Sequence, residues 1–108
     1  MSGTIFVSKD NFFDVRTVDF LVIVETIRPL TDTSSTAEKL LEMVDICAMN
    51  MICADELNPI EFLSFAYIMQ EVYVHLANQS SGLNLFFESI FACIDADERL
   101  VLSRDMSY

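Results

Sequence analysis

Residues 54–77 read ADELNPIEFLSFAYIMQEVYVHLA and carry the strongest local folding signal in the chain. Asn58 is a favourable helix N-cap, Pro59 suits the first helical position, and Glu61 complements the positive end of the helix dipole. From Ile60 to Leu76, apolar side chains cover most of the helix surface, and the polar ones share one narrow stripe. This pattern predicts a central core helix with neighbours packed on several sides.

Helices are also expected on both sides of the central helix. The sequence STAE at residues 35–38 matches a capping box with Ser35 as the N-cap, and the helix that it opens is expected to run to about Cys53. Large apolar side chains at helical spacing predict another helix over residues 83–94. Asp97 is expected to cap a last short helix through Leu102.

The segment 14–28 permits two interpretations. Its β-branched residues favour a strand, whereas its length without a turn signal and the proline at position 29 favour a helix that stops there. We interpret the segment as a helix. Before it, only Thr4–Val7 looks extended, and a polar break follows.

Composition favours one helical domain. A chain of 108 residues can bury a sizeable core, and 53% hydrophobic residues argue against a disordered chain. Two glycines and two prolines leave few tight turns, which favours long helices over many short strands. We therefore predict an all-α fold, a small bundle of four to five helices, in a single domain over residues 1–108.

The sequence predicts a cytoplasmic protein. It has no run of about 18 uncharged apolar residues, as a membrane span requires, and its N-terminus lacks the basic and apolar regions of a secretory signal. Cys47, Cys53 and Cys93 are odd in number and lie in apolar surroundings. We expect buried free thiols in a reducing compartment, with a disulfide between two of them as the alternative.

The charge is strongly negative and unevenly distributed. Seventeen acids and six bases give a net charge of −11. Residues 40–98 contain ten acids and no lysine or arginine, while the rest of the chain has seven acids and six bases. Charge that serves solubility alone is usually interspersed with both signs, so this segregation favours a surface for a positively charged partner. Direct nucleic-acid binding is not expected, because it requires a positive footprint.

No catalytic or metal-binding motif stands out. His75 is the single histidine, and Glu71 four residues earlier makes a helix-surface hydrogen bond its expected role. No Cys-x-x-Cys pair suggests zinc, residues 95–98 lack the glycine of a calcium loop, and no glycine-rich phosphate loop exists. We therefore expect no enzyme activity, no cofactor and no metal.

The second half of the chain resembles the colicin D immunity family, whose relatives include immunity proteins of contact-dependent inhibition systems. The similar features are the helix opening NPIEF at residues 58–62, the aromatic helix LFFE at 85–88, and the acidic turn DADER at 95–99. Residues 1–33 have no match in that family. The resemblance implies a helical fold and tight binding to a cytotoxic tRNA-cleaving nuclease.

Three functions agree with these features. The first is an acidic immunity protein that neutralises a nuclease toxin by covering its basic active-site cleft. The alternatives are a phage-type nucleic-acid mimic, which should carry two parallel rows of acids, and a helical module that forms homodimers through excess apolar surface. The predicted contact residues are acids near helix ends or on outward stripes: Glu42, Asp45, Asp55, Glu56, Asp95, Asp97 and Glu98. Tyr67 or Tyr73 could add an aromatic anchor if exposed.

Overall fold

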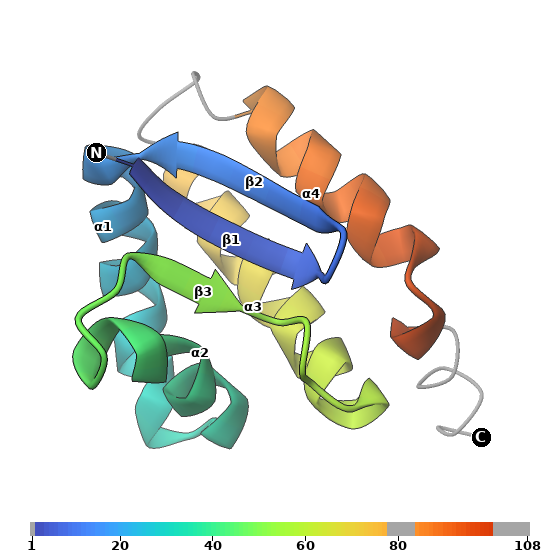
Figure 1. Cartoon of the computed structure of the whole chain (residues 1–108), viewed down its shortest axis with the longest axis horizontal. Helices are drawn as coiled ribbons and strands as arrows, with labels where there is room; N and C mark the ends of the chain where they lie inside the picture. The colour runs from blue at the N-terminus through green and yellow to red at the C-terminus, as the bar shows by residue number, and fades with distance from the viewer. Residues whose placement is uncertain (1, 78–83, 101–108) are drawn as a thin grey trace. The chain divides into compact units, whose positions relative to one another are not determined.

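A three-stranded β-sheet lies in the N-terminal part of the chain, so the prediction of an all-α bundle is wrong (Figure 1). The fold is mixed α/β. The computed structural model describes residues 2–77 and 84–100, and the chain divides into two units, Met1–Glu56 and Leu57–Tyr108. The prediction of a single domain over residues 1–108 stays a prediction.

Strands β1 (Ser2–Ser8) and β2 (Asn11–Arg16) form an antiparallel hairpin with a two-residue turn. Ile5 and Val7 of β1 are buried, as expected for alternate residues of a strand with one face on the core. The polar break after Thr4–Val7 is therefore the hairpin turn. Sequence reasoning missed it because residues 9–10, Lys-Asp, lack the Asn-Gly or Asp-Gly pair that marks such turns.

Strand β3 (Met51–Cys53) pairs in parallel with the other side of β1, which gives the sheet order β2-β1-β3. The helix that was predicted to reach Cys53 ends much earlier, because α2 spans Ser35–Asp45. Beyond the C-cap residue Ile46, Ala48 adopts a φ of 53°, a left-handed conformation that a helix continuing to Cys53 could not contain. Ile52 is fully buried opposite Ile5, so sheet pairing and burial outweigh the helical pattern of this segment.

Helix α2 also begins one residue away from the predicted position. Ser34 is the N-cap, and its hydroxyl accepts a hydrogen bond from the Ala37 amide at 3.2 Å. The prediction of Ser35 as the cap is wrong because two adjacent serines offer the same chemistry. The extended backbone of Ser34 decides between them.

The helical interpretation of segment 14–28 is confirmed for most of its length. Helix α1 spans Thr17–Ile27 and ends just before the 3₁₀ helix η1 (Arg28–Asp32), whose second residue is Pro29. The first three residues of the segment belong to β2 instead. Phe20 of α1 lies directly against Gly3 of β1, so the buried face of the helix covers the sheet. Together α1, η1 and α2 supply the crossover that parallel β1 and β3 require.

The helix predicted from the Asn58 cap is confirmed as α3 (Pro59–Ala77) in the C-terminal unit, and its central position stays a prediction. Asn58 and Glu61 form a reciprocal capping box. The Asn58 side-chain oxygen accepts from the Glu61 amide at 2.9 Å, and the Asn58 amide donates to the Glu61 carboxylate at 3.1 Å. Although α3 has 19 residues and is largely apolar, no helix in the described part of the chain is long and apolar enough to cross a membrane.

Helix α4 (Asn84–Ala96) packs against α3 through aromatic side chains. The Tyr73 ring lies 5.4 Å from the Phe87 ring and 5.7 Å from the Phe91 ring, measured between centroids. Asp97 caps the next turn as predicted, because its carboxylate accepts from the Arg99 amide at 2.9 Å. The predicted limits of Leu83 and Leu102 lie outside the described residues.

Candidate partner-binding surfaces

The predicted contact acids fall into three groups. Glu42 and Asp45 lie on α2, Asp55 and Glu56 lie between β3 and α3, and Asp95, Asp97 and Glu98 lie at the end of α4 and just after it. All of them are exposed except Asp97, which is partly buried. The first two groups belong to the N-terminal unit and the third to the C-terminal unit.

The first group borders a groove along the outer face of α2. The groove has a volume of about 500 Å³. Its described lining residues are Ser35, Glu38, Lys39, Glu42, Asp45 and Ile46. Three acids, Glu38, Glu42 and Asp45, therefore line this groove, and Lys39 adds one positive charge to it.

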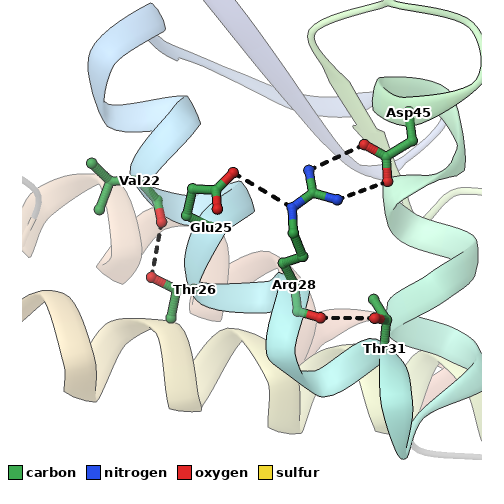
Figure 2. Close-up of polar contacts among 6 residues, drawn as sticks. All are labelled: Val22, Glu25, Thr26, Arg28, Thr31 and Asp45. Atoms are coloured by element: carbon green, nitrogen blue, oxygen red, sulfur yellow. Dashed lines mark hydrogen bonds and ion pairs between the residues drawn. The ribbon is translucent and has the colours of Figure 1, made fainter.

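The carboxylate of Asp45 forms an ion pair with Arg28. Figure 2 shows the Arg28 guanidinium between Glu25 and Asp45, with two parallel hydrogen bonds of 3.0 and 3.1 Å to the Asp45 oxygens. A longer contact of 3.5 Å joins Arg28 to Glu25. The hydrogen bonds from Arg28, helped by its charge, hold the pKa of Asp45 below its usual value despite some desolvation. Asp45 therefore ties the end of α2 to η1, and a cationic partner would have to compete with Arg28 for it.

Asp55 and Glu56 follow the short strand β3 and precede the capping box of α3. Both side chains are exposed. Burial raises the pKa of the neighbouring Cys53 thiol, and the negative charges of Asp55 and Glu56 raise it further. This thiol is therefore held in its unreactive protonated form.

The three cysteines are free thiols. Cys53 and Cys93 are partly buried, while Cys47 is exposed. The prediction of buried thiols is wrong for Cys47, because the helix that should have buried it ends at Asp45.

Asp97 is bonded to Arg99 rather than presented to solvent. Two hydrogen bonds of 3.0 Å join the Arg99 guanidinium to the two Asp97 oxygens, and a third of 3.0 Å reaches the Leu57 carbonyl. Burial raises the pKa of Asp97, but the hydrogen bonds and charge of Arg99 outweigh it and leave the pKa below its usual value. Asp95 and Glu98 are the exposed acids of this group.

A second groove lies between α3 and α4 in the C-terminal unit, with a volume of about 200 Å³. Its described lining residues are Leu63, Ala66, Tyr67, Gln70, Phe91, Ile94, Asp95 and Leu100. Tyr67 is 60% exposed, whereas Tyr73 is partly buried among phenylalanines. Of the two tyrosines considered as anchors, Tyr67 is the accessible one.

Sequence reasoning missed an exposed apolar strip on α1. Val18, Leu21 and Val22 are all exposed on the side opposite the buried residues of that helix. Helical spacing alone could have found them, because an inward face through Phe20 and Ile23 leaves these three positions outside. Ile46, at the end of α2, is another large exposed side chain.

Among the described residues, no group of three or more histidine, cysteine or acidic side chains could hold a metal ion. No protein-family model matches the sequence, and no curated protein is significantly similar to it.

A similar fold occurs among solved structures. The chain matches the immunity protein in the complex of a CdiA-CT toxin from Burkholderia pseudomallei E479 with its cognate CdiI immunity protein. The TM-score is 0.77, and the match covers 91% of this chain and 98% of the other at 18% sequence identity. The two proteins therefore share a fold, including its mixed α/β character, which was not predicted.

Proposed function

We propose that this protein is an immunity protein that binds and neutralises a cognate toxin of a contact-dependent inhibition system. The observation that carries this proposal is the fold match to an immunity protein in complex with its toxin, which covers nearly the whole of both chains. In this role the protein acts by binding and not by catalysis, and it needs no cofactor.

We further propose that the toxin is a nuclease, that it cleaves tRNA, and that the protein covers its basic active-site cleft in the cytoplasm. The net charge of −11 and its concentration in residues 40–98 support a basic partner. The resemblance of the second half to the colicin D immunity family supports a tRNA-cleaving nuclease. Opposite potentials speed the encounter and favour the cognate partner over others.

The proposed contacts come from the seven acids predicted from the sequence, which differ in their surroundings. Glu42, Asp55, Glu56, Asp95 and Glu98 present exposed carboxylates. Asp45 and Asp97 form ion pairs with Arg28 and Arg99. Each can contribute to partner binding only if its carboxylate is shared between that arginine and the partner. We therefore rank the five exposed acids above the two paired ones.

Co-expression in bacteria tests the proposal. A candidate cognate toxin domain is expressed alone, with this protein, or with an unrelated immunity protein as the control. Growth arrest by the toxin alone and rescue by this protein only would support the proposal. Unrelieved arrest together with no binding between the purified proteins would refute it.

The nature of the toxin is tested separately in the same cells. Intact tRNA in arrested cells would refute the tRNA-cleaving part of the proposal without affecting the immunity role. Cleaved tRNA that is restored to full length by co-expression of this protein would support both parts.

A further inference from the structure

The groove between α3 and α4 combines three features that suit one kind of ligand. Part of its wall is apolar, with Leu63, Ala66 and Ile94 among the lining residues, and part is polar. Tyr67, which is 60% exposed, lines the same groove. Asp95, an exposed carboxylate, lies at the groove as well.

The exposed charges of the C-terminal unit have one sign among the residues that the structure describes. Every exposed Asp, Glu, Lys or Arg that the structure describes between residues 57 and 100 is acidic, namely Glu71, Glu88, Asp95 and Glu98. Arg99 is the one described arginine of the unit, and Asp97 and the Leu57 carbonyl hold it. A cation that approaches this unit therefore meets a surface whose described exposed charges are negative.

The same unit already contains an arginine bound in this manner. The Arg99 guanidinium lies over the Phe62 ring at 4.0 Å while the Asp97 carboxylate accepts its hydrogen bonds. An aromatic face beside a carboxylate is a favourable environment for a guanidinium, which stacks on rings and bonds carboxylates in a planar geometry. Tyr67 and Asp95 offer the same pair of groups toward solvent.

We infer that the α3–α4 groove receives an arginine side chain from the basic protein partner. The aliphatic stem lies along the apolar walls, and the guanidinium lies against Tyr67 and Asp95. A volume of about 200 Å³ accommodates one such side chain and not a folded segment. The preference of the groove for an arginine side chain is argued from its lining residues. The identity of the partner as a toxin rests on the function proposed above.

An NMR titration of the full-length protein tests the groove without any toxin. The probe is N-acetyl-arginine methylamide, and the matched control is N-acetyl-citrulline methylamide, which has nearly the same shape but no charge. We expect the arginine compound to shift the resonances of Leu63, Tyr67 and Asp95, and the citrulline compound to shift them about tenfold less at equal concentration. Equal effects of the two compounds, or shifts elsewhere only, would overturn the inference.

Matched variants separate the groove from the rest of the unit. Tyr67→Ala should abolish the arginine-specific shifts, and Tyr67→Phe should retain them because the ring remains. Val74→Ala is the control, since Val74 is 62% exposed on the same helix and is not among the described lining residues. Loss of the shifts in Val74→Ala as well would contradict a specific groove.

Toxin binding then distinguishes failure of the groove from failure of the proposed function. We expect Tyr67→Ala to weaken toxin binding about thirtyfold and Asp95→Asn about fivefold, with Val74→Ala and Glu88→Gln within about twofold of the wild type. Tight binding that is insensitive to Tyr67→Ala would overturn the groove inference and leave the immunity role intact.

Absence of any toxin binding would overturn the proposed function, while the arginine titration still decides whether the groove binds arginine. A dimer of the isolated protein that Tyr67→Ala dissociates would assign the groove to a second copy and also overturn the inference.

Discussion

The Arg99 guanidinium lies over the Phe62 ring at 4.0 Å, and the same side chain donates to Asp97 and to the Leu57 carbonyl. One arginine thus joins the turn after α4 to the beginning of α3. The arginine and aspartate side chains are only 17% and 12% exposed, so solvent screens this ion pair weakly. The single described arginine of the C-terminal unit therefore has a structural role, and the exposed Asp, Glu, Lys and Arg side chains described in that unit are all acidic.

Replacement of Arg99 by methionine should destabilise the protein by about 2 kcal/mol, because Asp97 and the Leu57 carbonyl lose their donors while remaining largely shielded from water. Urea denaturation followed by circular dichroism measures the change. The control is Lys9→Met, which removes an exposed cation in the turn between β1 and β2. It should cost less than about 0.5 kcal/mol. Equal costs for the two variants would contradict a structural role for Arg99.

The Arg28–Asp45 pair should make stability depend on pH in the acid range. Because the folded pKa of Asp45 is below its usual value, the pair stabilises the protein above that usual value. The stabilisation is lost as the pH falls through the lowered pKa. From about pH 6 to about pH 3, the urea midpoint of the wild type should fall more than that of Asp45→Asn.

Asp55→Asn serves as the matched control, since Asp55 is an exposed acid of the same unit and has no ion pair with a described residue. Its midpoint should follow the wild type through the same pH range. Parallel curves for the wild type and Asp45→Asn would show that Arg28 does not stabilise the folded state through this carboxylate.

Gly3 should not tolerate a side chain. A Cβ added at this position would lie 2.6 Å from the Phe20 Cβ and closer still to two carbons of the ring side chain. Gly3→Ala should therefore cost about 2–3 kcal/mol through overpacking between β1 and α1. In a double-mutant cycle with Phe20→Leu, the combined cost should be clearly below the sum, because the smaller side chain makes room. If the two free-energy costs were strictly additive, the side chains at positions 3 and 20 would not be in contact.

Helices with local sequence signals could be predicted, whereas strands that depend on distant partners could not. Asn58 and Glu61 form their capping box from residues three apart, so α3 could be predicted in place. Ile52 belongs to a strand only because Ile5, far away in the sequence, lies beside it. A three-residue strand has too little local pattern to compete with the helical spacing around it.

At the candidate surfaces, too, local features could be predicted and contacts between elements could not. Exposure was expected for Glu42 on an outward helix stripe and for Asp95 at a helix end, and both acids are exposed. The engagement of Asp45 could not be predicted, because its partner Arg28 lies in another element and is brought near only by the fold. The groove at Tyr67 depends likewise on the packing of α4 against α3, which no single segment encodes.

Electrostatic steering predicts opposite effects of two neighbouring charges in the α2 groove, if the proposed toxin binds there. Glu42→Gln should slow association about twofold, because it removes attraction for a basic partner. Lys39→Gln should accelerate association by a similar factor, since it removes the described positive charge of the same groove. Stopped-flow mixing measures both rates.

For the wild type, raising the salt concentration from about 0.05 to 0.5 M should lower the association rate at least about tenfold and change the dissociation rate little. The two variants should converge with the wild type at the higher concentration, because screening removes the long-range part of the attraction. Association that is no slower at high salt would rule out steering as the reason for the segregated charge. Rates of both Glu42→Gln and Lys39→Gln that equal the wild-type rate would instead place the partner away from α2.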